Sequence, residues 1–136
     1  MAGRFQAYEV ALEMASAMRP TLLWMARQDK NLEDQLRRAA ASVVLNIAEG
    51  ARRVGKDRLH LYRVAAGSAA ELRSGLSLAI AWGYLDPTHV EAVVVLLDRV
   101  LAMLWLGLSP SGLRPGRATH AALFTCGKWW RLTHRR

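Results

Sequence analysis

Asn46 and Glu49 are the polar residues of this sequence whose spacing most suggests chemistry, because residues three apart on a helix lie on one face. They lie in SVVLNIAEGARR, residues 42–53, a mostly apolar segment that ends in two arginines. A catalytic pair would need a nucleophile, a metal or a suitable base beside it, and this segment offers none. We therefore interpret both residues as structural, with Glu49 placed four residues before Arg53 for a helical ion pair.

The other candidates for catalysis or metal binding are equally isolated. Ser68 lies among small residues (AAGSAA, residues 65–70) and has no neighbouring base to activate it. The four histidines lack ligand-like spacing, and the single cysteine, Cys126, excludes an internal disulfide. We expect no enzymatic activity, no metal and no cofactor, and we expect a reducing, cytoplasmic setting.

Charge is the most informative property of the composition. The 136 residues carry a formal net charge of +8. From Ser109 onward there are six basic residues and no acidic ones, whereas the first 108 residues hold 13 bases against 11 acids. A nearly neutral body with a basic tail favours a polyanionic partner such as nucleic acid.

Two groups of residues are candidates for contacting that partner. The first surrounds a predicted turn and consists of Arg52, Arg53, Lys56, Arg58 and Arg63. The second lies in the tail and consists of Arg114, Arg117, Lys128, Trp129, Trp130, Arg131, Arg135 and Arg136. Cations suit phosphates, and aromatic rings among cations suit the bases of single-stranded nucleic acid. The alternatives are a solvated helix end for the first group, and a membrane surface or a tail folded back on the body for the second.

Hydrophobic periodicity predicts helices and no sheet. We expect a helix over 5–28 kinked at Pro20, then helices over 31–53, 56–83 and 86–107, with Asn31 and Asp86 as N-caps. Short connections favour an all-α, up-down-up-down antiparallel four-helix bundle over residues 1–108, followed by the tail, 109–136. The long apolar run near the end of this bundle carries Glu91, Asp98 and Arg99, so we expect no membrane span.

The periodicity also predicts which helix faces form the core. On the first helix the predicted core positions are Tyr8, Leu12, Ala15, Met18, Leu22 and Met25. On the last helix they are Val90, Val93, Val94, Leu97, Val100, Leu101 and Leu104. That last helix has a second apolar stripe, which we expect to meet another copy of the chain: Ala92, Leu96, Met103 and Leu106.

A turn near Gly55 would make the second and third helices antiparallel, with facing residue numbers adding up to roughly 110. Small residues then face small residues, which permits a close approach of the two backbones. We expect the interface between these helices, or its edge, to contain Arg38, Ser42, Asn46, Glu49, Gly67, Ser68 and Glu71. The same register places Arg37 or Arg38 near Glu71, and it explains a glycine within a helix.

Two stretches, QLRRAAASVVLNIAEGARR and YRVAAGSAAELRSGLSLAIAWGYL, together resemble the four-helix bundle family named for proteins encoded in intervening sequences of large-subunit ribosomal RNA genes. The matching block covers residues 35–85, and the helical layout extends it to about Leu108. The resemblance implies a small bundle that assembles as a ring-shaped homopentamer without established enzymatic activity. A related group, the accessory variability proteins of diversity-generating retroelements, implies a basic pentamer that binds nucleic acid and a reverse transcriptase. The basic tail lies outside the matching motifs.

These observations lead to one preferred function and one alternative. We expect a non-enzymatic homo-oligomer that binds RNA or single-stranded DNA through its basic residues, as an accessory factor to an RNA-processing or reverse-transcriptase system. The alternative is a structural or scaffolding oligomer whose tail docks a partner protein.

Overall fold

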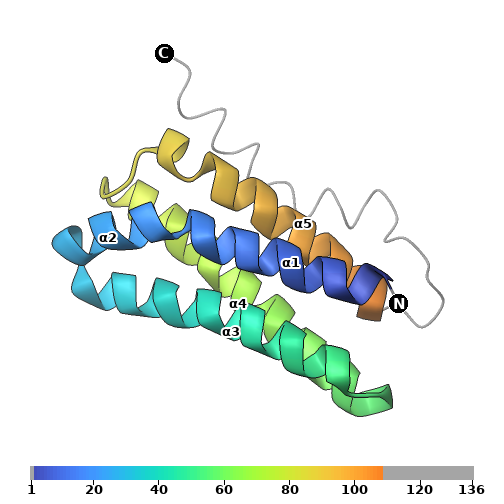
Figure 1. The fold of residues 1–136 in the computed structure, drawn as a ribbon. Helices are drawn as coiled ribbons and strands as arrows, with labels where there is room; N and C mark the ends of the chain where they lie inside the picture. The colour runs from blue at the N-terminus through green and yellow to red at the C-terminus, as the bar shows by residue number, and fades with distance from the viewer. Residues whose placement is uncertain (1, 109–136) are drawn as a thin grey trace.

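The computed structural model describes residues 2–108, which form helices joined by short connections (Figure 1). The elements are α1 (Ala2–Ala17), α2 (Arg19–Gln28), α3 (Lys30–Arg52), α4 (Gly55–Ala81), the short 3₁₀ helix η1 (Pro87–His89) and α5 (Glu91–Leu108). Within this described range there are no strands, as the periodicity predicted. The predicted tail, residues 109–136, lies outside it.

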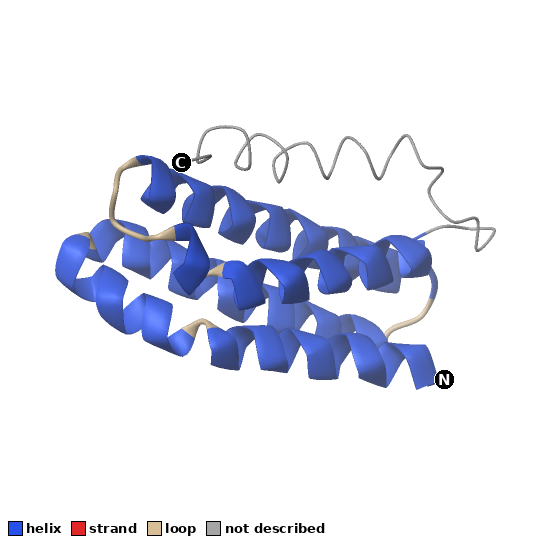
Figure 2. Cartoon of the chain, turned by 90° about the horizontal axis from the view of Figure 1, so that it is seen from above, coloured by secondary structure: helices blue, strands red, loops and turns tan. Residues whose placement is uncertain are grey.

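The structure has five α-helices rather than the predicted four, because the helix expected over 5–28 is interrupted at Met18. Figure 2 shows this interruption between α1 and α2 as a short loop. Pro20 occupies the first turn of α2 and lacks the N–H that would continue the hydrogen bonding of α1. The Met18 N–H still reaches the Met14 carbonyl oxygen at 3.0 Å, so the chain changes direction with little loss of helical bonding.

The remaining helix boundaries follow local sequence signals. The N-cap of α3 is Asp29 rather than the expected Asn31, and its carboxylate accepts a 3.0 Å hydrogen bond from the Leu32 N–H. Asp86 is a cap as expected, but it caps η1, accepting from the Thr88 N–H at 2.9 Å, and α5 begins only at Glu91. Gly83, with φ of 78°, ends the α4 segment in the left-handed conformation that favours glycine.

The helices pack around a single core. Contacts join α3 to α4, α4 to α5, α5 to α1 and α1 to α3, while α2 extends α1 and covers the start of α3 (Figure 1). The predicted core stripe of α5 is confirmed, because all of its members are buried except Val94, which is partly buried. On α4 the fully buried positions include Ala65, Ala69, Leu72, Leu76 and Ala79.

The predicted core face of the first helix is partly wrong. Met18 and Met25 are fully buried, but Leu12 is 42% exposed, and Tyr8, Ala15 and Leu22 are only partly buried. The core positions of α1 are Ala7, Val10, Ala11 and Met14, and Met18 follows at the break. The buried face continues in steps of three and four residues from Ala7 through Met18 to Met25, so the expected stripe was one residue out of phase over α1 and met the true face at Met18 and Met25.

Candidate nucleic-acid interface

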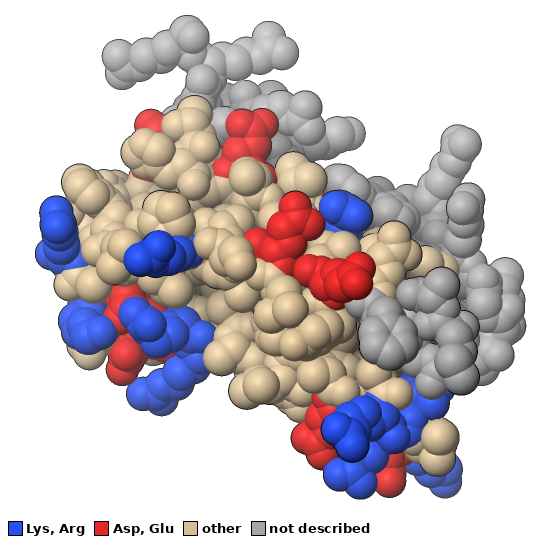
Figure 3. Space-filling view, viewed as in Figure 1, with Lys and Arg blue, Asp and Glu red and all other residues tan. Residues whose placement is uncertain are grey.

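The turn between α3 and α4 presents the first predicted group of cations, which we call the basic turn (Arg52, Arg53, Lys56, Arg58 and Arg63). The chain reverses at Gly55, whose φ of +59° is the left-handed conformation that glycine adopts without strain. Figure 3 shows Lys and Arg side chains gathered at the lower right of the molecule, where this turn lies in Figure 1. The structure therefore brings this sequence-predicted group together at one end of the bundle.

Only two of these cations are engaged within the part of the chain that the structure describes. The Arg53 Nη2 lies 2.9 Å from the Glu49 Oε1, the predicted helical ion pair, and the Arg58 Nε donates to the Arg53 carbonyl oxygen at 2.8 Å. Arg52, Lys56 and Arg63 are exposed and have no partner among residues 2–108. Three side chains thus remain available for an anion.

The N-terminus of α4 adds to the positive potential of the basic turn. Val54 is its N-cap residue and makes no side-chain cap hydrogen bond. The first N–H groups of a helix carry partial positive charge, which attracts anions. Residues 49–63 hold five cations against two acids, Glu49 and Asp57, which gives this segment a formal charge of +3.

The second predicted group of contacts falls in the tail, outside the described residues. It comprises Arg114, Arg117, Lys128, Trp129, Trp130, Arg131, Arg135 and Arg136.

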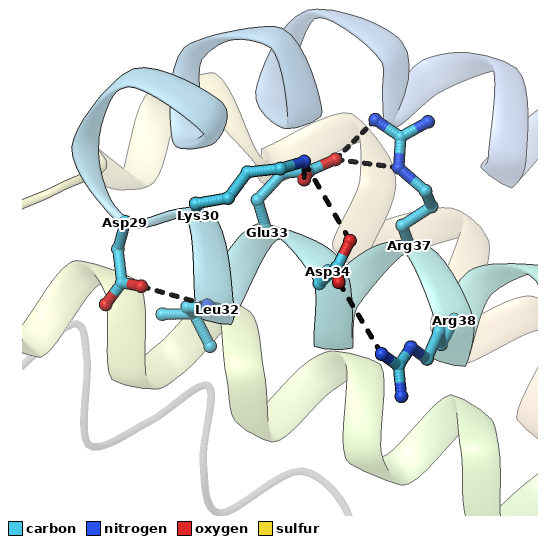
Figure 4. Close-up of polar contacts among 7 residues, drawn as sticks. All are labelled: Asp29, Lys30, Leu32, Glu33, Asp34, Arg37 and Arg38. Atoms are coloured by element: carbon cyan, nitrogen blue, oxygen red, sulfur yellow. Dashed lines mark hydrogen bonds and ion pairs between the residues drawn. The ribbon is translucent and has the colours of Figure 1, made fainter.

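A second concentration of charge, at the start of α3, differs from the basic turn because its own acids neutralise it (Figure 4). Glu33 has a fully buried side chain, and its Oε2 lies 2.5 Å from the Lys30 Nζ. The Arg37 Nε donates to the Glu33 Oε1 at 2.7 Å, and a second Arg37 nitrogen contacts the same oxygen. Asp34 pairs with Arg38 at 3.5 Å.

This Glu33 site is electrostatically stabilised in its charged form. The hydrogen bond from Lys30 and the next largest effect, the hydrogen bond from Arg37, lower the pKa of the Glu33 carboxyl below its ordinary value. Burial alone would raise this pKa, but its effect is smaller. The two cations remain mostly exposed while they cover the carboxylate. Glu33 was not singled out from the sequence, and the signal that could have found it is the spacing of Lys30 three residues before it and Arg37 four residues after it.

The polar residues of the α3–α4 interface make a small hydrogen-bonded group. The Ser42 and Ser68 Oγ atoms lie 2.7 Å apart. The sum of these two residue numbers agrees with the value of roughly 110 expected for facing residues, so the predicted register of the two helices is confirmed here. The Asn46 Nδ2 donates to the Ser42 carbonyl oxygen at 2.8 Å and to its Oγ at 3.1 Å. The two hydroxyls hydrogen-bond to each other and to an amide nitrogen, and none of these groups is a base that could activate a serine.

Two glycines provide the close approach of α3 and α4. A Cβ on Gly50 would lie 2.7 Å from two carbons of the Tyr62 ring, and one on Gly75 would lie 2.6 Å from the Leu36 Cδ2. Larger side chains therefore fill the spaces that these glycines leave, and small residues do not simply face each other throughout.

Three residues expected at this interface are placed differently. Gly67 is exposed, and a Cβ there would meet nothing within 4 Å, so close packing does not explain this glycine. Arg37 and Arg38 pair with Glu33 and Asp34 on their own helix, and not with the exposed Glu71. Ion pairs one turn apart on the same helix take precedence over a pair across the interface.

The proposed oligomer stripe of α5 is also revised, at two of its four positions. Ala92 and Leu106 are exposed and Met103 is partly buried, but Leu96 is only 8% exposed because it packs in the chain's own core. Val95, which is 55% exposed, lies beside Ala92 and one turn before the charged Arg99. Met103 packs against the core, whereas Ala102 continues the line of Ala92 and Val95 at helical spacing, so we call Ala92, Val95, Ala102 and Leu106 the outer face of α5.

No helix within residues 2–108 is long and apolar enough to cross a membrane. The same residues hold no group of three His, Cys, Asp or Glu side chains that could bind a metal ion.

Residues 2–108 define the general class of this protein, an all-helical bundle with a basic turn at one end. The chain belongs to the 23S rRNA-intervening sequence protein family, whose model matches residues 4–105. It is similar to a Bacteroides thetaiotaomicron protein of unknown function from the S23 ribosomal protein family. The TM-score is 0.70 at 19% identity, covering 76% of this chain and 98% of that one. At this identity the likeness shows the fold. No curated protein matches the chain.

Proposed function

We propose that this protein is a non-enzymatic homo-oligomer that binds nucleic acid through the basic turn. The observation that carries the proposal is the contrast between its two basic regions. Residues 27–38 hold four cations against three acids, and three of those cations are paired with acids of the same helix. At the basic turn, Arg52, Lys56 and Arg63 are exposed and unpaired within the described range. An unpaired cation can contact a phosphate without first giving up an ion pair within the protein.

Oligomerisation would strengthen this interaction. We propose that α1 and α2 together act as one member of an up-down-up-down four-helix bundle, and that the outer face of α5 contacts another copy. Val95 and Leu106, each about half exposed, support this contact. The family resemblance implies five copies in a ring, which would repeat the basic turn and raise its effective affinity for a long polyanion.

The biological setting in this proposal is the cytoplasm, with the tail as a further nucleic-acid contact. The family's description refers to intervening sequences of 23S rRNA, which supports RNA as the first ligand to examine. A role as accessory factor to an RNA-processing or reverse-transcriptase system follows from the same resemblance.

A salt-dependent titration with RNA, single-stranded DNA and duplex DNA tests the function. Arg52→Gln with Lys56→Gln should weaken binding to all three and reduce the salt slope by roughly 0.7 to 0.9 per lost phosphate contact. Arg38→Gln with Arg99→Gln removes the same charge elsewhere on the surface and is the matched control. If the parent protein binds none of the three, the scaffolding function replaces this one.

A further inference from the structure

Three aromatic residues meet at the end of the molecule opposite the basic turn, and we call them the aromatic cluster (Trp24, Trp82 and Tyr84). Trp24 lies on α2, Trp82 is the C-cap of α4, and Tyr84 follows it. The Trp24 Nε1–H donates to the Tyr84 carbonyl oxygen at 2.8 Å, across 60 residues of sequence. The Trp82 and Tyr84 rings lie edge to face, with centroids 6.0 Å apart and an interplanar angle of 77°. Helix α2 and the end of α4, where these residues lie, are at the left of Figure 1.

The two tryptophans are positioned but not buried. Trp24 is 49% exposed and Trp82 is 57% exposed, although tryptophan is highly buried on average. The hydrogen bond of Trp24 engages its single donor and holds the ring in place. A need of the indole N–H for water therefore does not explain why the ring is exposed. A ring that is already held loses little conformational entropy when a ligand packs against it.

The helix that carries Trp24 is cationic. Helix α2 contains Arg19 and Arg27 and no acid, and both arginines are exposed. Arg27 lies one turn after Trp24, on the same side of the helix. Residues 74–85 carry no charge, and the carboxylate of Asp86 is engaged by the N–H and hydroxyl of Thr88.

We propose that the aromatic cluster stacks against unpaired bases of single-stranded nucleic acid, with Arg27 contacting its phosphates. This inference rests on the nucleic-acid binding proposed above and names the ligand class. Exposed rings beside cations match the stacking and phosphate contacts of single-strand binding. Duplex bases have both faces covered by their neighbours, so the cluster favours single strands.

The position of the cluster makes it a second contact, separate from the basic turn. Helix α4 begins in the basic turn and ends just before Trp82, its C-cap, and its 27 residues span about 40 Å at the ordinary rise of an α-helix. A strand long enough to reach both ends gains from simultaneous engagement, whereas a short strand contacts one end at a time.

The test compares the affinities of a labelled, unstructured single strand and of a matching duplex, measured by fluorescence anisotropy. Trp24→Ala with Trp82→Ala should weaken single-strand binding roughly 5- to 100-fold, the range expected for lost base stacking. Duplex affinity and the salt slope should stay as in the parent, because the cations of the basic turn are kept. Trp24→Phe with Trp82→Phe should restore part of the loss.

Trp105→Ala is the matched control, because Trp105 is 45% exposed on α5 and lies outside the cluster. Thermal melting by circular dichroism verifies that each variant folds. If the parent binds both ligands and the double alanine variant binds the single strand equally well, the stacking inference fails while nucleic-acid binding stands. If the parent binds neither ligand, both proposals fail. A lower mass of the double variant in light scattering would assign the cluster to an interface between copies and overturn stacking.

Discussion

The hydroxyl oxygens of Ser42 and Ser68 lie 2.7 Å apart across the interface of α3 and α4. Asn46 adds two hydrogen bonds to Ser42 from one turn along the same helix. These contacts connect two helices through short side chains, and they engage the groups that could otherwise serve as nucleophile or polar partner. The Ser42–Ser68 contact is therefore a packing feature that sets the register of the helix pair.

Replacing Ser68 with Leu should destabilise the fold by about 1 to 3 kcal/mol, because the larger side chain overpacks this interface. Chemical denaturation monitored by circular dichroism measures the change. Ser77→Leu is the matched control, since Ser77 is exposed on the same helix and the same substitution there should change stability by less than about 0.5 kcal/mol. Equal melting temperatures for Ser68→Leu and the parent would contradict the packing role.

Replacing glycine with alanine should have opposite effects at two helical positions. Gly67→Ala should stabilise the protein by up to about 1 kcal/mol, because the new Cβ enters open space and alanine favours helix. Gly50→Ala should destabilise it by about 1 to 3 kcal/mol despite the same propensity gain, because its Cβ would meet the Tyr62 ring at 2.7 Å. Urea titration of both variants measures the difference, and a stabilised Gly50→Ala variant would contradict this account of the close approach.

Glu33 should make part of the stability depend on acid pH. Its pKa is lowered in the folded state, so its contribution is present above the ordinary value of 4.5 and is lost as the pH falls through the lower folded value. Glu33→Gln should therefore be less stable than the parent at neutral pH, and the difference should shrink in acid. Denaturant titrations over a pH series measure this.

The control for the pH series is Glu49→Gln, because Glu49 forms an ion pair with Arg53 in which both side chains are about half exposed. Such exposed pairs contribute little to stability. A difference between Glu33→Gln and the parent that stayed constant down to strong acid would show that the charge of Glu33 is not the cause.

The outer face of α5 should mediate self-association. Val95→Glu with Leu106→Glu should lower the mass measured by light scattering while leaving the helical content largely intact, because both side chains are about half exposed in the single chain. Leu96→Glu is unsuitable for this purpose, since Leu96 is buried and a charge there would disrupt the core. Val54→Glu, at an exposed apolar residue of the α3–α4 turn, serves as control. A parent protein with a mass near that of one chain, 15.1 kDa, would rule the interface out.

Much of the helical layout could be predicted because its signals are local. Gly55 and Gly83 end or begin helices through their backbone conformation, and the apolar stripe of α5 has one dominant period. The face of α1 could not be predicted as reliably, because apolar residues lie on two neighbouring faces of this helix: Leu12 is apolar yet exposed, whereas Ala11 beside it is buried.

The candidate site also has one part that the sequence could predict and one part that it could not. The basic turn was predictable because its cations are close in sequence around a single reversal. The aromatic cluster was not, because Trp24 and Tyr84 are 60 residues apart and meet only through tertiary packing. The burial of Glu33 also depends on how its cations fold over it, whereas a first-turn glutamate is ordinarily solvated.

The Tyr62 ring of α4 lies between α3 and the last turn of α5. A Cβ on Gly107 of α5 would lie 3.3 Å from this ring, on the edge opposite to the one that faces Gly50 of α3. The last turn of α5 is thereby pinned beside the helices that lead into and out of the basic turn. One ring is therefore a contact shared by three helices, so a change that loosens the last turn of α5 should also loosen the packing of the two helices that present the basic turn.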